Sequence, residues 1–366
     1  MTYKEALFFI GKCLTLSLWP ERKEEIRKVI RSGSVVWEQV VWTSTDQLVF
    51  TALHLQLKRA GLLEELPSEL IEYMEEFTSV NRERNHQLMC QAHEITELLN
   101  NQGIVPIFLK GVGHLLDGLY DDIGERQVGD IDILVKENNM VRAAEILIAE
   151  GYFPSTEFDP NSQKVQRHYP RLLNENRTGA VEIHRQIFTS SFYETMDNEL
   201  IVKNGRMLNT PSMSFVMSNV HQVVYNILNV QISDKAYYYA KVFLRQIYDL
   251  LMLSRREDPM DAMKGFEKFF HLMNVNLALA DQLLDHPGTI SFHSNWRTKL
   301  FIFRVFYKLN HPLWSRVSNG ILYLWFRCTN SANYFLRAIY DRNIRRSVYH
   351  RLGNPKWYYE HLKSYK

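Results

Sequence analysis

The sequence contains little cysteine. Its three cysteines, Cys13, Cys90 and Cys328, lie far apart and are odd in number. They therefore form neither the paired framework of a disulfide-rich domain nor the closely spaced pattern of a zinc site. Unpaired thiols at this density are typical of a reducing compartment, and we expect the protein to be cytoplasmic.

Long hydrophobic runs are also absent. No uninterrupted apolar stretch approaches the roughly 20 residues that a membrane-spanning helix needs, so we expect no membrane insertion. There is no Gly-x-Ser-x-Gly motif and no P-loop, which excludes two common forms of hydrolase and nucleotide site. Hydrophobic residues make up 46% and charged residues 23% of the chain, as expected of a globular protein rather than a disordered one.

Acidic residues are scarce at the C-terminal end. Residues 301–366 contain twelve Lys and Arg against two Asp and Glu, about +10 in a chain whose net charge is +2, which leaves about −8 for residues 1–300. This basic stretch is rich in aromatic residues. It is either a packed helical region with Arg-rich outer faces or a face that stacks on and binds an anionic partner. We favour the first, because most of so many rings are expected in a core, and nucleic acid is the less favoured partner. Spacings of three and four predict packed helices built on Phe303, Phe306, Leu309, Ile321, Leu324 and Trp325.

Hydrophobic periodicity divides the chain into three regions. Residues 1–100 and 206–366 have the spacing of amphipathic helices, whereas residues 101–205 mix short apolar runs with helical stretches. The sequence thus predicts an α+β fold: a helical N-terminal region, a central core and a helical C-terminal region. In the core we expect strands at 104–109, 131–135, 166–173 and 180–187, and helices at 111–120 and 138–150. Elsewhere we expect long helices at 45–60, 67–98, 214–230 and 236–254.

Two pairs of polar residues stand out in the expected strands of the core. Asp130 and Asp132 alternate with apolar residues, so both carboxylates point to the same face of a strand. Two like charges on one face repel each other, but a divalent cation such as Mg²⁺ is held by such carboxylates together with substrate phosphates. Glu182 and His184 alternate in the same way. If the two strands are neighbours, Glu182 completes a site of three carboxylates.

The residues that precede the first pair are suited to phosphate. Gly111 and Gly113 lie where a strand should turn into a helix, and such a turn exposes backbone N–H groups to an anion. Lys110 is a candidate for contact with the β- and γ-phosphates of a nucleotide. Arg126 is a second candidate, because a guanidinium can grip two phosphate oxygens at once. For both cations, a plain surface position is an equally good interpretation.

Four further polar residues have two interpretations each. His184 either orients Glu182 or binds substrate, or it is simply satisfied within the sheet. His221, Arg245 and Asp249 lie among apolar residues on expected helices. They either contact the base or sugar of a nucleotide or have structural roles. Arg245 and Asp249 are four residues apart and so are able to pair with each other.

These motifs resemble the nucleotidyltransferase superfamily, whose pattern is a glycine turn on a helix, Asp-x-Asp on a strand and a third carboxylate on a later strand. LKGVGHLLDGLY, GERQVGDIDILV and VEIHRQI, followed by His221 and LRQIYDLLML, are similar to an uncharacterised bacterial nucleotidyltransferase family. The resemblance covers roughly residues 85–255. It implies a small mixed sheet, two-metal chemistry and an NTP donor.

The sequence departs from the superfamily pattern at three places. Lys110-Gly111 followed by Val112 stands where Gly-Ser or Gly-Gly is usual, and the gap from Gly111 to Asp130 is longer than in minimal members. The third carboxylate is Glu182 rather than the commoner Asp. The role of Glu182, as metal ligand or as general base, is therefore open.

The sequence therefore predicts a nucleotidyltransferase that moves an NMP group from an NTP to a hydroxyl or phosphate and releases pyrophosphate. Asp130, Asp132 and Glu182 would hold Mg²⁺ or Mn²⁺, and Lys110, Gly111, Gly113, Arg126 and His184 would contact the nucleotide. The acceptor is undetermined: a small molecule, a sugar, a peptide, a protein or an RNA end. The alternative is a non-catalytic module that binds nucleotide or metal and regulates a partner through its helical arms.

Overall fold

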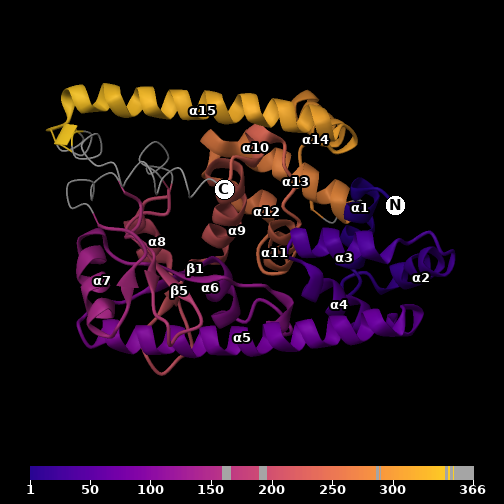
Figure 1. Cartoon of the computed structure of the whole chain (residues 1–366), viewed down its shortest axis with the longest axis horizontal. Coiled ribbons are helices and arrows are strands. Elements are labelled where there is room, and N and C mark those ends of the chain that lie inside the picture. Colours follow the sequence, from indigo (N-terminus) through magenta and orange to yellow (C-terminus); the bar gives the residue numbers. More distant parts are fainter. Residues whose placement is uncertain are drawn as a thin grey trace.

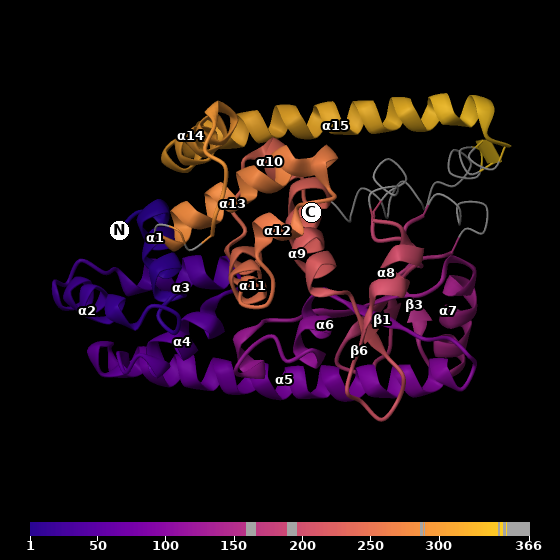
Figure 2. The ribbon, with the colours of Figure 1, turned by 180° about the vertical axis from the view of Figure 1, so that it is seen from behind.

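The computed structural model describes residues 1–158, 166–188, 196–285 and 290–342, with isolated positions at 288, 345, 346 and 349. The molecule is elongated, with one long helix, α5 (Ser68–Asn100), along one side and another, α15 (Pro312–Tyr340), along the opposite side. A sheet and its helices lie at one end of the space between them, the N-terminal helices lie at the other end, and helices of the C-terminal region lie in the middle (Figure 1). The view from behind in Figure 2 shows the same arrangement.

The N-terminal region is helical, as predicted. A capping box between Thr2 and Glu5 begins the first helix. Pro67 precedes the long α5, and Gly61 has the positive φ of 61° that ends the segment after α4. The single helix expected at 45–60 is wrong, because the chain turns at Leu48, which has a φ of 55°. The helices of this region are α1 (Tyr3–Cys13), α2 (Lys23–Arg31), α3 (Trp37–Asp46), α4 (Phe50–Arg59) and α5.

The central region forms a mixed sheet of seven strands, in the order β3-β4-β5-β2-β1-β7-β6. β2 pairs with β5 in parallel and with β1 in antiparallel fashion, and β1 pairs in parallel with β7. Helices α5, α6 (Lys110–Leu116) and α7 (Met140–Ala149) pack against the central strands. The strands are β1 (Ile107–Leu109), β2 (Asp130–Leu134), β3 (Phe153–Pro154), β4 (Leu172–Leu173), β5 (Ala180–His184), β6 (Arg206–Met207) and β7 (Phe215–Val216).

Two expected elements of the core and its border differ in extent. Of the strand expected at 166–173, only β4 pairs with neighbouring strands, apart from a single bridge at His168. The helix expected at 214–230 begins at Asn219, because Phe215 and Val216 pair with β1 and extend the sheet. Strands of two residues, such as β4 and β7, carry too few side chains to show an alternating pattern.

The C-terminal region is helical, but the expected helix at 236–254 is divided. Ala240 adopts a φ of 48° and separates a short helix from the next. α1 packs against α13 and α14, so the first and last regions of the chain are in contact. The helices are α8 (Asn198–Asn204), α9 (Asn219–Leu228), α10 (Ala236–Tyr239), α11 (Leu244–Ser254), α12 (Pro259–Ala262), α13 (Phe270–Leu284), α14 (Trp296–Asn310) and α15.

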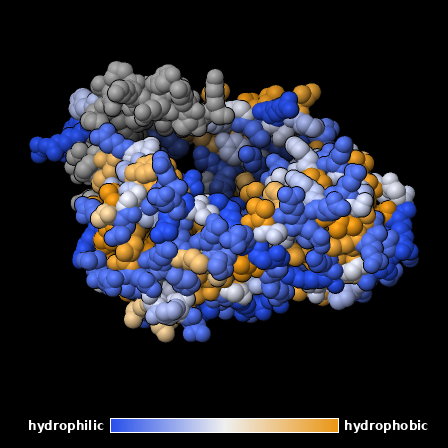
Figure 3. All heavy atoms as spheres, turned by 60° about the horizontal axis from the view of Figure 1, so that its bottom comes forward, coloured by the Kyte–Doolittle hydropathy of each residue, from blue (hydrophilic) through white to orange (hydrophobic). Residues whose placement is uncertain are grey.

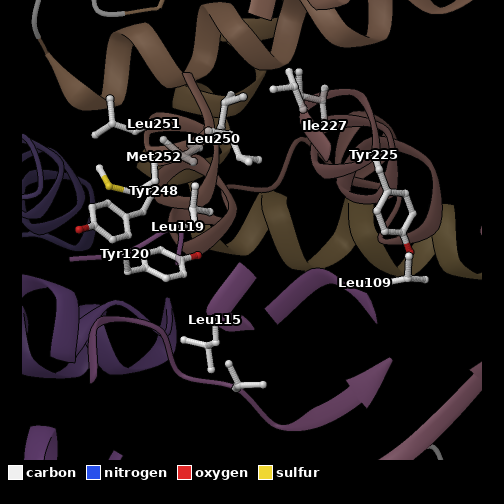
Figure 4. Close-up of a cluster of buried hydrophobic side chains, with 14 of the residues drawn as sticks. Leu109, Leu115, Leu119, Tyr120, Tyr225, Ile227, Tyr248, Leu250, Leu251 and Met252 are labelled. Carbon is white, nitrogen blue, oxygen red and sulfur yellow. The ribbon is translucent and has the colours of Figure 1, made fainter. Parts of the chain in front are cut away.

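A buried cluster joins the central unit to the C-terminal helices (Figure 4). Tyr120, which follows α6, stacks on Tyr248 of α11 with ring centroids 6.3 Å apart. Leu115 of α6 and Leu250 of α11 are fully or almost fully buried beside them. This packing holds α11 above the strand that carries Asp130 and Asp132.

The expected packing of the aromatic C-terminal stretch is wrong in large part. Phe301 and Val305 of α14 are buried, and Phe306 and Leu309 are partly buried. The other predicted core residues are largely exposed. α15 contacts the body mainly through α10 and α14, and no further element of the described residues packs on its other side. The exposed residues are Phe303 at 63% exposure, Ile321 at 62%, Leu324 at 61% and Trp325 at 54%.

Over the part of the chain that the structure describes, none of the helices is both long enough and apolar enough to cross a membrane.

Candidate active site

The carboxylates predicted from the sequence lie on two neighbouring strands. In the parallel register of β2 and β5, Asp132 is paired with Glu182 and Asp130 with Ala180. Asp132 is 2% exposed, whereas Asp130 and Glu182 are half-buried. The alternation that puts Ile131 and Ile133 into the core thus brings the polar side chains to one face of the sheet, as predicted.

Two side chains converge on one oxygen of Asp132. Lys110 Nζ lies 2.7 Å from Asp132 Oδ1, and His184 Nε2 lies 2.8 Å from the same atom. His184 Nε2 is also 3.6 Å from Glu182 Oε2, and its Nδ1 is buried with no hydrogen-bond partner in the described part of the protein. The structure therefore joins His184 to both carboxylates.

These contacts separate the pKa values of the carboxyl groups. Burial by itself would raise the pKa of Asp132, but the hydrogen bond from His184 and the charge of Lys110 outweigh it and hold that pKa well below its usual range. The hydrogen bond from His184 likewise lowers the pKa of Glu182. Asp130 has a raised pKa, because burial and the neighbouring carboxylates outweigh the charges of Lys110 and Arg171.

The donor set fits a hard divalent cation. Ligand atoms of Asp132, Glu182 and His184 lie within 4.8 Å of one another, and Asp130 is on the same strand face. Carboxylate oxygens are the ligands that Mg²⁺ and Mn²⁺ prefer, whereas an imidazole that bonds a ligating carboxylate orients it. The raised pKa of Asp130 indicates that negative charge is incompletely neutralised here, and a cation would relieve it.

The strand-to-helix turn has the predicted position. Lys110 begins α6 with a φ of 49°, a left-handed conformation that is uncommon for a residue with a side chain. A Cβ atom on Gly113 would lie 2.8 Å from the carbonyl oxygen of Phe108, so glycine there allows the helix to lie close to β1. Gly111 lines the cavity in front of the carboxylates. The two glycines thus have different surroundings, and Gly113 has an evident packing role.

The two candidate arginines have opposite surroundings. Arg126 is buried, and its Nε donates to both carboxylate oxygens of Asp249 at 2.9 and 3.1 Å. Tyr120 also donates to Asp249, at 2.6 Å. Arg245 is not paired with Asp249 in any ion pair among the described residues, and its Nε is buried without a hydrogen-bond partner there. Burial and the charge of Arg126 lower the pKa of Arg245 to about 10.

A cavity of about 200 Å³ lies in front of the carboxylates. Asp130 and Asp132 are on one wall and Arg245 is on the wall that α11 provides. Asp234, Arg245 and Gln246 also line a second cavity of about 490 Å³, which extends towards α14 and α15. The space-filling view in Figure 3 shows a hollow with mainly hydrophilic walls near the middle of the molecule.

Residues of α5 that the sequence did not single out hold the site's loops. Asn81 and Asn85 donate to backbone carbonyls at residues 123–126. Gln91 both donates to and accepts from the backbone of Gly179, just before β5. The sequence pattern could have identified these residues, because they are polar residues at positions that the helical spacing of α5 places on its buried face. His221 bonds Ser218 at the start of its own helix and thus has a structural partner.

One comparison bears on the identity of the chain. The model of an uncharacterised nucleotidyltransferase family matches residues 33–280, which include all the candidate site residues. No curated protein is similar enough to the chain to count as a relative. The match spans about two thirds of the chain and contains the sheet, the carboxylates and Arg245, and the chain therefore belongs to this uncharacterised nucleotidyltransferase family.

Proposed function

We propose that the protein transfers a nucleoside monophosphate from an NTP, with ATP as the first donor to test, to an acceptor hydroxyl or phosphate. One observation carries this proposal: the parallel register of β2 and β5 brings Asp132 beside Glu182, with Asp130 on the same face and a cavity in front. This is a site for divalent cations and the triphosphate that they neutralise. The cytoplasm supplies both ATP and Mg²⁺, and we place the reaction there.

The chain's own residues have distinct roles in the proposed reaction. Asp130 and Asp132 are the carboxylates for the metal that accompanies the triphosphate, and Lys110 and His184 keep Asp132 ionised and fixed. When bound, Mg²⁺ or Mn²⁺ neutralises phosphate charge and lowers the pKa of the acceptor hydroxyl. The acceptor oxygen forms a bond to the α-phosphorus as the bond to the bridging oxygen breaks. Pyrophosphate leaves. As a base, Glu182 receives the acceptor's proton; as a metal ligand, it leaves that proton to water.

Arg245 rather than Arg126 is the proposed phosphate contact from the far wall. Arg126 already has both oxygens of a buried carboxylate as partners, so its guanidinium is engaged. Arg245 lines the same cavity as the carboxylates and has an Nε without a partner among the described residues. A buried cation of this kind gains most from an anionic ligand.

Asp132→Asn and Glu182→Gln test the reaction. Purified protein with Mg²⁺ or Mn²⁺ and labelled ATP should release pyrophosphate or transfer label to an acceptor from cell extract. Asp132→Asn should abolish transfer and metal-dependent ATP binding, whereas Glu182→Gln should reduce turnover much more than affinity. Asp121→Asn, a half-exposed acid in a surface ion pair, is the matched control and should stay active.

The same assay separates the enzyme from the regulatory alternative. ATP binding that depends on metal and on Asp132, with no pyrophosphate and no labelled product in any extract, would favour a non-catalytic nucleotide-binding module. Near-normal transfer by Asp132→Asn would mean that the site has been assigned to the wrong residues.

Arg245→Gln and Arg126→Gln form a second pair. Arg245→Gln should weaken ATP binding by about 1.5–3 kcal/mol and leave the fold unchanged, because it removes one charge-assisted contact. Arg126→Gln leaves the buried Asp249 without its cation and should destabilise the fold by about 3–5 kcal/mol. Arg245→Lys should recover part of the affinity. Equal ATP affinity in Arg245→Gln and the parent would remove Arg245 from the phosphate site.

The acceptor approaches, in this proposal, through the second cavity, which shares Asp234, Arg245 and Gln246 with the first. Its walls combine lysines with hydroxyl and amide side chains, which suit a polar acceptor of any of the classes named above. A screen of labelled extract fractions, small molecules separated from protein and RNA, identifies the class.

A further inference from the structure

One face of α15 is an exposed apolar surface, and α15 carries more exposed large apolar side chains than any other described helix. Nine of its apolar side chains are between 53% and 77% exposed, whereas Ala338 is the one buried hydrophobic side chain among the described residues of α15. The exposed residues are Leu313, Trp314, Val317, Ile321, Leu324, Trp325, Phe335, Leu336 and Ile339. An apolar patch of this length on a monomer marks an interaction surface.

The exposed face is not the face by which α15 is attached. On its inner side, Asn319 accepts a hydrogen bond from Lys308 at 2.8 Å, and Phe326 packs on Tyr238 at 5.1 Å between ring centroids. Lys235 Nζ lies 4.4 Å from the centre of the same Phe326 ring. Figures 1 and 2 both show α15 along the outer edge of the molecule. The exposure of its apolar side chains shows that the described body does not cover them.

The charge around this face has one sign. No Asp or Glu occurs between Asp285 and Asp341, whereas the same stretch contains seven Lys and Arg residues. Three of them, Arg316, Arg327 and Arg337, are exposed on α15 itself. A second copy of the chain would bring like charges together, and a strongly anionic surface is the complementary partner.

The composition of the exposed face favours a lipid surface as the partner. The face combines tryptophan with aliphatic and aromatic side chains, and Arg316, Arg327 and Arg337 provide cationic groups on the same helix. This combination is typical of an amphipathic helix that lies in a membrane interface.

We infer that α15 is an interfacial helix that lays its apolar face on an anionic lipid surface and brings the proposed active site to membrane-bound or membrane-derived acceptors. The helix lies in the headgroup region and does not cross the bilayer. The binding part of this inference stands on α15 alone. Its link to an acceptor rests on the proposed function.

Vesicle sedimentation tests the binding. Full-length protein should co-sediment with vesicles of phosphatidylcholine and phosphatidylglycerol, and at least tenfold less with pure phosphatidylcholine vesicles. Sodium chloride at 0.5 M should reduce the binding, because it screens the arginine contribution. Tryptophan emission should shift to shorter wavelength on binding, and Trp314→Phe with Trp325→Phe should remove most of that shift.

A pair of double variants locates the surface. Ile321→Glu with Leu324→Glu should weaken vesicle binding at least tenfold. Val80→Glu with Met213→Glu adds the same charge at positions 64% and 54% exposed elsewhere and should change it less than twofold. Unchanged helix content in both double variants shows that the fold is retained. Pyrophosphate release without vesicles should be equal in both double variants and in the parent. Absence of release from the parent itself would count against the proposed function and not against α15.

Two results would overturn the inference. The first is no binding to anionic vesicles, or binding that Ile321→Glu with Leu324→Glu leaves unchanged. The second is an oligomer of the parent protein that this double variant converts to monomer, which would make the face an interface between copies of the chain.

Discussion

The two longest helices, α5 and α15, lie on opposite sides of the molecule. One face of α5 is buried against the body, whereas the apolar face of α15 is largely exposed. α5 has 33 residues and α15 has 29, and both carry amphipathic spacing. Ten side chains of α5 are buried, among them Asn81, Asn85 and Gln91, which bond the backbone next to the site. The apolar face of α15 has no such partner layer among the described residues.

The difference shows what periodicity predicts and what it leaves open. A three- and four-residue spacing says that a helix has an apolar face, but whether the chain supplies a layer to cover that face depends on the tertiary fold. The buried face of α5 contains amides because loop carbonyls need donors there. The outer face of α15 contains no such residues at its centre, only apolar side chains, as an external apolar partner requires.

Truncation gives the largest expected effect and tests this contrast directly. A 1–310 fragment loses α15 and should fold, because α15 contributes few buried side chains. A 1–300 fragment also loses most of α14, including Phe301 and Val305, which are 2% and 0% exposed. Each such side chain contributes about 1.5–3 kcal/mol, so this fragment should be insoluble or strongly destabilised. Expression, solubility and urea unfolding of the two fragments measure the effect.

The opposite outcome is informative too. If 1–310 were insoluble and 1–300 soluble, α15 would stabilise the body and its apolar face would not be free for another partner.

Asn85→Ala is the second test, on the α5 side. Asn85 is 0% exposed and its amide donates to the carbonyls of Ile123 and Arg126. Loss of the amide removes the donor to the carbonyl of Ile123 and leaves the carbonyl of Arg126 with Asn81 alone, which costs about 1–3 kcal/mol. Urea unfolding should show this loss, whereas Asn333→Ala on the exposed part of α15 should change stability by less than about 0.5 kcal/mol. Equal effects of the two variants would contradict the contrast.

Much of the site was predictable from local pattern. The alternation of polar and apolar residues on two strands predicted that Asp130, Asp132, Glu182 and His184 lie on one face. A lysine before two glycines predicted the position of the turn from strand to helix. The pairing of β2 with β5, which makes these residues neighbours, was an assumption at the level of sequence. Non-local strand pairing depends on the whole fold and leaves no mark in a single strand.

An ion pair and two helix interruptions could not be predicted from the sequence pattern, for physical reasons. Arg245 and Asp249 are four apart, yet Asp249 pairs with Arg126 from a distant loop, because packing of α11 on α6 brings that loop closer. The helices are interrupted at Leu48 and Ala240, and neither position is a glycine or proline that would have predicted the interruption. Both residues line the cavities beside the site, where strained backbone is commonly retained.

A pH effect of intermediate size is expected where α4 meets α5. His54 Nδ1 lies 2.8 Å from the hydroxyl of Thr78, and burial, followed by the charge of Lys58, lowers the pKa of His54 to about 4. Between pH 6.5 and pH 4 the unfolded chain therefore binds a proton that the folded protein does not, so stability falls as pH falls through this window. His54→Gln should reduce that loss by about 1–2 kcal/mol, measured as the difference in urea midpoints at pH 7 and pH 5. An equal pH dependence in variant and parent would show that His54 titrates alike in both states.

Single alanine substitutions sharpen the contrast at matched positions, and the one on α15 gives the smallest expected effect. Leu88 of α5 is 0% exposed, and Leu88→Ala should cost about 2–5 kcal/mol through lost burial and the cavity left behind. Leu324 of α15 is 61% exposed, and Leu324→Ala should change the free energy of unfolding by less than about 0.5 kcal/mol in the absence of vesicles. With anionic vesicles present, the same Leu324→Ala should lower vesicle affinity measurably, because the leucine then has a surface to be buried in. A cost above about 1.5 kcal/mol without vesicles would mean that α15 is packed against protein, and the contrast between the two helices would fail.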